Sequence, residues 1–244
     1  MKTLEPAAST SPAPERVQLF YELLEKVVTL FRKKRMLAFQ RMFAVSERTR
    51  ILDVGGTKLN WELMSARPQV TLLNLRVEER IEGRFHWKPG DARQLQFADN
   101  SFDICYSNSV IEHVGGREDW DRFASEIRRT APAYFVQTPN YWFPVETHQA
   151  SLFLHWLPRR IERRLVRYLS VWGWATRQTQ ENIDKWLAYN NLLTKRDMVR
   201  LFPDAEIMVE RFLLLPKSLI AVKRPAQRPS QPEQPERRVA ATLA

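Results

Sequence analysis

The segment Ile51-Leu52-Asp53-Val54-Gly55-Gly56-Thr57 decides the fold. It is a short apolar run, typical of a buried strand, that closes on an acid and two glycines. Because glycine has no Cβ, a strand can turn sharply into a helix at such a point, and the amides exposed there can bind a polar ligand. The segment predicts a strand, a ligand-binding turn and a helix, although the same pattern also occurs at strand-helix turns that bind nothing.

The residues that follow continue this order. We expect a helix over residues 59–66, a buried strand over 70–75 and a short strand over 85–87. A turn near residue 100 then leads into a further apolar strand that ends near residue 107. Such alternation predicts an α/β fold, with a mostly parallel sheet, helices on both faces and ligands at the carboxyl ends of the strands.

Three later segments match a known family in the same order: Gly90-Asp91-Ala92, Ser101-Phe102-Asp103 and the run Ser107 to Val114. From residue 51 to about 140 the chain resembles the class I S-adenosylmethionine-dependent methyltransferases, in particular the methyltransferase type 11-like group. The resemblance implies S-adenosylmethionine as cofactor and a Rossmann-like sheet of seven strands whose last two form an antiparallel hairpin. Residues 205–214 and 218–223, separated by Pro216-Lys217, fit that hairpin.

The resemblance also assigns eight residues to the cofactor site. They are Asp53, Gly55 and Gly56 in the first loop, Asn74 at the ribose position, Asp91 and Ala92 near the adenine, and Asn108 and Ser109 at the methyl-donor end.

The chain departs from the family pattern at two places. Thr57, Lys58 and Leu59 stand where further small residues are common, so the loop is expected to be tighter or differently shaped. Asn74 replaces an acid whose two oxygens accept hydrogen bonds from the ribose hydroxyls. Since an amide accepts one such bond and donates another, weaker cofactor binding is expected, unless Glu78 or Glu79 folds back to substitute.

Length and composition favour one main domain. With 244 residues and 44% hydrophobic content the chain can bury a sizeable core. We expect a domain at 16–224, with an N-terminal helix at 16–45 and a substrate-side insertion at 139–192, between disordered segments at 1–15 and 225–244. The single cysteine, Cys105, excludes an intrachain disulfide and is expected to be buried, which suits a reducing cytoplasm. No apolar segment approaches the roughly 20 residues that span a bilayer.

Basic residues are concentrated in the flanks. Residues 31–50, 151–170 and 223–244 carry net charges of +6, +4 and +3, against +10 for the whole chain, so the remaining residues carry −3. This distribution favours a peripheral contact with an anionic partner over a nucleic-acid channel. The helix at 16–45, with Arg32-Lys33-Lys34-Arg35, either caps the sheet with a solvated basic face or contacts an anionic membrane surface.

The run Pro139-Asn140-Tyr141-Trp142-Phe143-Pro144-Val145-Glu146-Thr147-His148 follows the expected fifth strand and starts at the active-site edge. We predict Glu146 and His148 as catalytic residues that bind or deprotonate an acceptor, against the alternative that His148 is a structural strut. Glu112 and His113 are expected to be structural. No pair of His and Cys residues has metal-ligand spacing, so no metal site is expected.

Residues 151–170 combine aromatic, apolar and arginine side chains in an interfacial pattern, which a lid packed on the main fold would explain equally well. We predict methyl transfer to a small-molecule, lipid-like, aromatic or glycan-lipid acceptor, in a cytoplasmic protein that is peripheral at the inner face of a membrane. Two alternatives are an inactive methyltransferase-like binding module, favoured by the glycine-poor loop and Asn74, and a nucleic-acid-modifying methyltransferase, favoured by the basic flanks.

Overall fold

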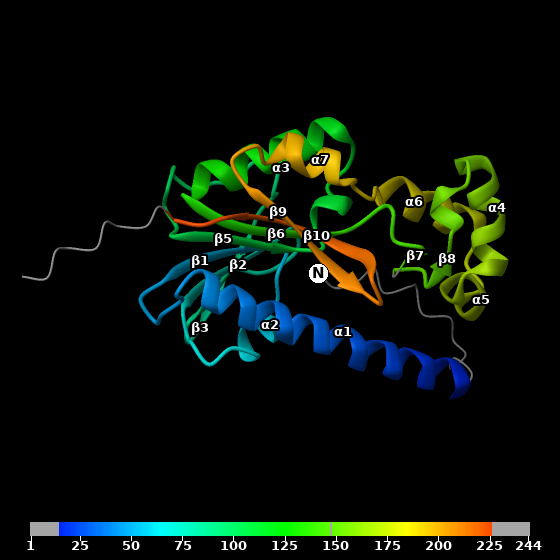
Figure 1. Ribbon diagram of the computed structural model, residues 1–244, viewed down its shortest axis with the longest axis horizontal. Coiled ribbons are helices and arrows are strands. Elements are labelled where there is room, and N and C mark those ends of the chain that lie inside the picture. Colours follow the sequence, from blue (N-terminus) through cyan, green and yellow to red (C-terminus); the bar gives the residue numbers. More distant parts are fainter. Residues whose placement is uncertain (1–14, 147, 226–244) are drawn as a thin grey trace, which may run out of the picture.

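The computed structural model describes residues 15–146 and 148–225, with side chains described from Thr29 onward. The predictions for the first 14 residues and for the tail from residue 226 lie outside this part of the chain. Its centre is an eight-stranded sheet of order β3-β4-β2-β1-β5-β6-β10-β9 (Figure 1). The strands are β1 (Arg50–Val54), β2 (Gln69–Asn74), β3 (Arg80–Glu82), β4 (Phe85–Pro89), β5 (Ile104–Asn108), β6 (Ala133–Pro139), β9 (Glu206–Phe212) and β10 (Leu215–Lys223).

The five inner strands are parallel, as the alternation of strands and helices predicted. β1 pairs in parallel with β2 and β5, β2 with β4, and β5 with β6, so their carboxyl ends lie along one edge of the sheet. β10 is antiparallel to both β6 and β9, which confirms the C-terminal hairpin.

The turn of that hairpin was predicted at Pro216-Lys217, and this prediction is wrong. Leu213 and Leu214 form the turn, both with positive φ, and Pro216 and Lys217 lie within β10, where the pairing has a bulge between Pro216 and Ser218. Proline cannot donate to a strand ladder, so a bulge is one of the few places in a strand where it is tolerated.

The prediction of seven strands is also wrong by one. The additional strand, β3, pairs antiparallel with β4 at the edge of the sheet, and all three of its residues are exposed. Arg80 and Lys58 each make an ion pair with Glu82 there. Charged side chains on a short exposed strand hinder edge-to-edge pairing between molecules, so this strand protects the edge of the sheet.

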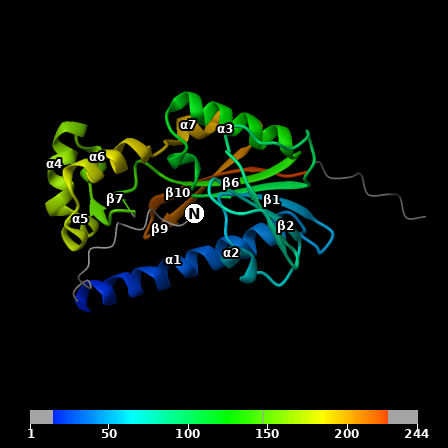
Figure 2. The same ribbon diagram turned by 180° about the vertical axis from the view of Figure 1, so that it is seen from behind.

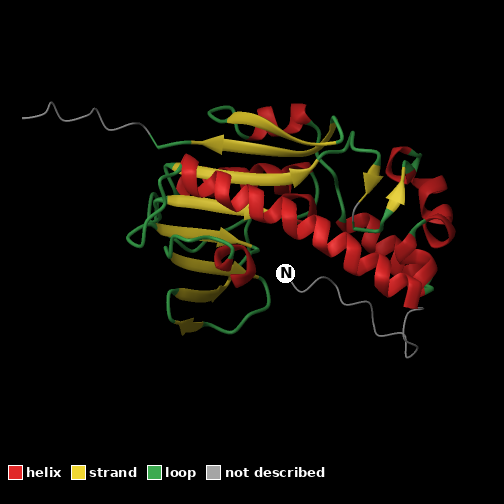
Figure 3. Ribbon diagram, turned by 60° about the horizontal axis from the view of Figure 1, so that its bottom comes forward, coloured by secondary structure: helices red, strands yellow, loops and turns green. Residues whose placement is uncertain are grey.

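Helices cover both faces of the sheet. α1 (Glu15–Met42) and the short α2 (Lys58–Glu62) lie on one face, and α3 (Arg117–Thr130) and α7 (Lys195–Leu201) on the other (Figures 1 and 2). Figure 3 shows α1 lying across its face of the sheet and extending beyond it. α2 ends at Glu62, earlier than the predicted residue 66.

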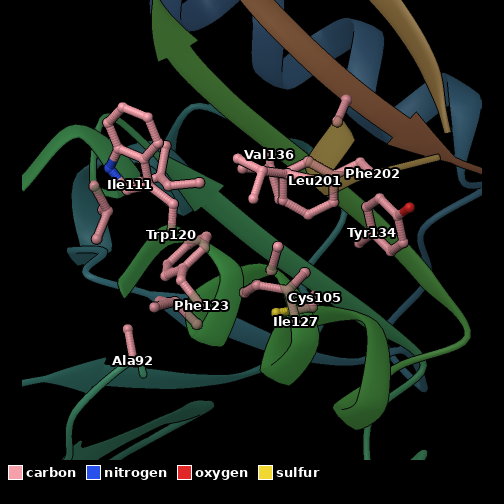
Figure 4. Close-up of a cluster of buried hydrophobic side chains, with 14 of the residues drawn as sticks. Ala92, Cys105, Ile111, Trp120, Phe123, Ile127, Tyr134, Val136, Leu201 and Phe202 are labelled. Carbon is pink, nitrogen blue, oxygen red and sulfur yellow. The ribbon is translucent and has the colours of Figure 1, made fainter. Parts of the chain in front are cut away.

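Strand residues alternate between two cores. In β6, Ala133 and Phe135 pack with α1 and α2, whereas Tyr134 and Val136 pack with α3 and α7. Figure 4 shows the second core, which contains Cys105; that side chain is fully buried, as predicted. This alternation is the period of two that a strand imposes on its side chains.

The chain between β6 and α7 forms a separate lobe beyond the carboxyl ends of the parallel strands (Figure 1). It contains the paired strands β7 (Val145–Glu146) and β8 (Ser151–Leu152), the 3-10 turn η2 (Leu154–Trp156), and the helices α4 (Arg159–Leu169), α5 (Val171–Thr176) and α6 (Gln180–Tyr189). Leu154, Val166, Ile183 and Leu187 form its own small core. Among the helices of the described residues, none is long and apolar enough to cross a bilayer.

Candidate active site

The first loop depends on glycine at both positions. Gly55 has φ +75°, and a Cβ there would lie 2.5 Å from Val110 Cγ2; at Gly56 a Cβ would lie 1.7 Å from Asp53 Oδ2. Side chains cannot be accommodated at either point, so the backbone passes directly over the end of β1. The geometry explains why the sequence has an acid followed by two glycines.

Asp53 is the buried centre of this loop. Its side chain is fully buried and accepts a 2.7 Å hydrogen bond from Trp61 Nε1 of α2. Burial raises the pKa of Asp53 to about 7, although the bond from Trp61 opposes the shift. Oδ1 has no hydrogen-bond partner within the described residues.

Asn74, at the end of β2, braces the glycine loop. Its side-chain nitrogen donates a 3.0 Å hydrogen bond to the carbonyl of Gly56, and its backbone carbonyl accepts one from the backbone N–H of Gly90. An acid at this position could not donate to the Gly56 carbonyl. The departure from the family pattern therefore has a structural use in this chain, whatever its part in ribose binding.

Asp91 and Asn108 are both held by arginines. Arg93 donates to both oxygens of Asp91 and lowers the pKa of that carboxyl. Arg35 of α1 donates to Asn108 Oδ1 and forms a buried ion pair with Glu210 of β9. These contacts fix the two side chains at the ends of β4 and β5.

The parallel pairing brings the predicted cofactor residues to one edge. Asn74 is paired with Pro89, Val54 with Ser107, and Asn108 with Gln137, so the ends of β2, β4, β1, β5 and β6 are neighbours. Ser109, with φ 55°, donates from its hydroxyl to Gln137 Oε1, whereas Ala92 is buried in the core.

A buried cluster of two glutamates and two histidines lies beyond this edge. His148 Nδ1 lies 2.7 Å from Glu146 Oε1, and His148 Nε2 lies 4.0 Å from Glu112 Oε1. Glu112 and His113 form part of η1 (Ile111–His113), directly after β5, and the ring of His113 packs edge-on against that of His148. The predicted pair Glu146 and His148 is thus in direct contact, whereas the participation of Glu112 and His113 was not predicted.

The electrostatics of the cluster follow from burial and proximity. Burial raises the pKa of Glu112 to about 7 and lowers that of His113 to about 3. Burial disfavours the charged form of His148 as well, but the carboxylates of Glu146 and Glu112 outweigh it and raise the pKa of His148 to about 9. The sequence contained one signal for this cluster. The segment with Glu112 and His113 follows β5 and the segment with Glu146 and His148 follows β6, and these strands are neighbours whose carboxyl ends lie at the same edge of the sheet.

Comparison with known proteins agrees with this arrangement. Residues 61–131 match the family model of a methyltransferase domain. The chain carries a class I S-adenosylmethionine-dependent methyltransferase domain. Its cofactor is S-adenosylmethionine. No curated protein matches the chain.

Solved structures share the fold of this methyltransferase domain. A possible exported protein from Bordetella parapertussis is 16% identical, with a TM-score of 0.57 over 92% of this chain and 77% of that one. Phosphoethanolamine N-methyltransferase 2 of Haemonchus contortus, in complex with S-adenosyl-L-methionine, is 14% identical, with a TM-score of 0.51 over 79% of this chain and 52% of that one. The same enzyme with phosphomonomethylethanolamine and S-adenosylhomocysteine is 15% identical, with a TM-score of 0.50 over 79% and 53%.

The residues of the methyltransferase domain fit the cofactor in two respects. The loop over Gly55 and Gly56 carries no side chains, because Val110 and Asp53 occupy the positions that a Cβ would need, and Asp53 leaves one buried carboxylate oxygen unpartnered within the described part of the chain. That each of the eight assigned residues contacts the cofactor remains a prediction.

Proposed function

We propose that this methyltransferase domain methylates an acceptor with an apolar portion, which it takes from the surface of an anionic membrane. The observation that carries the proposal is the hairpin tip, defined here as Phe212 to Leu215. Leu213 and Leu214 are 80% and 87% exposed, and Phe212 and Leu215 beside them are 37% and 45% exposed.

The backbone of the hairpin tip makes these leucines unusual. Leu213 and Leu214 have φ 46° and 70°, the left-handed region that two-residue hairpins usually fill with Asn-Gly. A leucine in this region costs roughly 1–2 kcal/mol because its Cβ approaches the carbonyl oxygen. The leucines therefore do not serve the turn, and exposed apolar residues kept at such a cost support a contact with an apolar partner.

The hairpin tip is close to the candidate active site along the sheet. Ser218 of β10 pairs with Pro139 at the carboxyl end of β6, and the tip lies a few residues beyond that pair. The insertion lies on the same side of the molecule (Figure 1). Apolar side chains at this edge support delivery of an acceptor to the methyl-donor end without passage through water.

The insertion adds an exposed aromatic cluster, which consists of Trp142, Phe153 and Trp156. The ring centroid of Trp156 lies 6.2 Å from that of Trp142 and 5.2 Å from that of Phe153. The three residues are 59%, 51% and 37% exposed. Aromatic rings of this kind are enriched at the level of lipid headgroups, where an apolar body and a polar edge are both accommodated.

Basic side chains of α4 supply the electrostatic part. Arg160, Arg164 and Arg167 are exposed and make no ion pair within the described residues, whereas Arg163 pairs with Asp184. Each basic residue near an anionic surface contributes about 1 kcal/mol, so three such arginines add reversible attraction to the apolar contacts. The predicted contribution of Arg35 is wrong, because that side chain is buried against Glu210 and Asn108.

The chemistry asked of the protein is modest. S-adenosylmethionine, when bound, would supply an activated methyl group and would leave as S-adenosylhomocysteine, and the proton of the acceptor would pass to water. The protein has to align the acceptor and exclude water. His148 is the residue we assign to acceptor contact, since 23% of its side chain is accessible, and Glu146, with 1% accessible, is assigned the role of positioning it through their hydrogen bond.

Flotation with vesicles tests the membrane contact. The wild-type protein should float with vesicles that contain anionic lipid. A Leu213→Asn/Leu214→Gly variant should lose this binding while the turn becomes easier to form, and a triple Arg160→Glu/Arg164→Glu/Arg167→Glu variant should lose it too. The matched control is Arg41→Glu/Arg48→Glu/Arg196→Glu, which reverses three other exposed arginines without ion pairs in the described structure and should still float.

Methyl transfer is tested separately, with the labelled cofactor and vesicles that contain amphiphiles with hydroxyl, amine, carboxyl or phenol headgroups. Transfer to one headgroup class, lost in the tip variant, is the expected result. Cofactor binding without transfer to any class would favour an inactive binding module. Transfer to RNA or DNA that persists at high salt would favour a nucleic-acid-modifying enzyme and overturn the proposal.

A further inference from the structure

The buried cluster beyond β5 and β6 holds three side chains of metal-ligand type. Glu112, His113 and His148 each offer one ligand atom, and these atoms all lie within 4.8 Å of one another. Glu112 is fully buried and His113 is 5% exposed. Two imidazoles and a carboxylate are a donor set that first-row divalent cations accept.

Several polar atoms of this cluster lack partners. Glu112 Oε1 is buried without a hydrogen bond in the described part of the chain. The backbone of Tyr189 lies near the His113 ring, but neither ring nitrogen meets a partner with hydrogen-bond geometry. Leaving a buried polar atom unsatisfied costs about 1–3 kcal/mol, so Glu112 Oε1 and one nitrogen of His113, both directed at the same position, indicate that a ligand belongs there.

The neighbours of the three side chains orient them as in a metal site. Glu146 Oε1 lies 2.7 Å from His148 Nδ1, and Nε2 of the same ring lies 4.0 Å from Glu112 Oε1. A cation bound there would replace the proton that Nε2 carries in the charged form of His148. Thr138 donates a 3.0 Å hydrogen bond to Glu112 Oε2, so Oε1 is the oxygen left over. Metal-ligating side chains in proteins are typically held by such hydrogen bonds from neighbouring carboxylates and hydroxyls, which orient them toward the metal.

We propose that Glu112, His113 and His148 bind one divalent first-row cation, such as Zn²⁺ or Mn²⁺. At ligand distances of about 2.1 Å the donor atoms stand roughly 3.0–3.4 Å apart, so the cluster has to contract by about 1 Å around the ion. The cation would take over the positive charge that a protonated His148 supplies between Glu112 and Glu146, which have no lysine or arginine paired to them in the described residues.

The cation would have open coordination positions beside the methyl-donor end. This role rests on the proposed function: an acceptor oxygen bound to the metal would be oriented and would lose its proton more readily. Binding of the ion itself does not depend on the identity of the acceptor, so it is measured without either lipid or cofactor.

The test uses the full chain, stripped with a chelator and titrated with Co²⁺ while visible absorption is recorded. One equivalent should produce d–d bands, and Zn²⁺ should displace the Co²⁺ and remain bound at one atom per chain by elemental analysis. Glu112→Gln, His113→Asn and His148→Asn should each abolish the bands. Glu146→Gln should weaken the affinity for Co²⁺ by about 10–100-fold, because it alters the hydrogen bond that orients the ligand His148.

The matched control is His86→Asn. His86 lies 3.0 Å from Glu79 on the surface and could bind metal adventitiously, so this variant should leave the spectrum unchanged. Absence of bands in the folded wild-type protein would overturn the proposal and leave a protonated His148 between the glutamates, independently of whether methyl transfer to membrane acceptors is observed. Bands that persist in Glu112→Gln, or vanish in His86→Asn, would also overturn it.

Discussion

Trp61 Nε1 donates a 2.7 Å hydrogen bond to Asp53 Oδ2, and both side chains are fully buried. The bond joins α2 to the end of β1 with the glycine loop between them. It gives the buried carboxyl one good partner and leaves its other oxygen without one in the described structure.

Asp53 should make stability depend on pH. Its pKa is raised from 3.8 to about 7 by burial, so the folded state holds a proton that the unfolded state has lost across this range. Relative to Asp53→Asn, the wild-type protein should therefore lose up to roughly 4 kcal/mol as pH rises from 4 to 8. Urea unfolding of both proteins measures this difference. Glu47→Gln removes an exposed carboxyl and serves as control; its free energy of unfolding should follow that of the wild-type protein at every pH. If the wild-type protein gained stability relative to Asp53→Asn as pH rises, the raised pKa of Asp53 would be contradicted.

Gly55→Val should abolish cofactor binding. The new side chain would meet Val110 and would require a β-branched residue at φ +75°. Calorimetric titration with S-adenosylhomocysteine measures the loss. Gly116→Ala, at a glycine with open space around it, should bind normally. Because Gly55→Val could fail to fold, the double variant Gly55→Ala/Val110→Ala provides a second measurement: it relieves the clash but not the backbone strain, so it should fold and bind weakly.

Arg35→Ala should destabilise the domain by about 1.5–3 kcal/mol, because it removes the 2.8 Å ion pair with the half-buried Glu210, whose remaining basic neighbour, Lys217 Nζ, lies 4.0 Å away. Denaturant unfolding measures this, with Lys34→Ala, an exposed neighbour on α1, as control. Replacing both partners, as Arg35→Met/Glu210→Met, should recover most of the loss. An Arg35→Ala protein as stable as the wild type would show that the pair contributes nothing to the packing of α1 on β9.

Leu213→Asn/Leu214→Gly should raise the free energy of unfolding by about 1–2 kcal/mol, since both new residues tolerate positive φ better than leucine does. The same measurement on Leu215→Asn alone, at a position outside the strained turn, should show no such gain. A loss of stability in the double variant would mean that the exposed leucines pack within the protein, which would also remove the main support for the membrane contact.

Local sequence patterns gave much of the fold correctly. The apolar run before Gly55 indicated β1, and the alternation of strands and helices indicated a mostly parallel sheet, because periodicity and glycine positions act over a few residues. The two errors, the missed strand β3 and the misplaced hairpin turn, also arose where the local sequence carries no signal. The polar edge strand β3 carries no apolar period, and the turn at Leu213-Leu214 carries none of the residues that normally mark a turn.

The candidate site was predicted only in part. Asp53, Gly55, Gly56 and Asn74 were assigned from motif order, and the structure places them at one sheet edge with a reason for the asparagine, its hydrogen bond to Gly56. Glu146 and His148 were predicted as catalytic residues; the structure places them in contact, and their catalytic role stays a prediction. Glu112 and His113 were assigned a structural role, since spacing along the chain does not reveal which loops meet.

The sequence by itself determined the sheet, the glycine loop and the basic flanks, since propensity, glycine geometry and net charge are properties of neighbouring residues. Tertiary structure alone decided that Arg35 is buried against Glu210, that two leucines protrude from a strained turn, and that His148 meets Glu112 across 36 residues. The physical reason is common to all three: the register of β5, β6, β9 and β10 brings distant segments together, and burial then sets the charge and partners of each side chain.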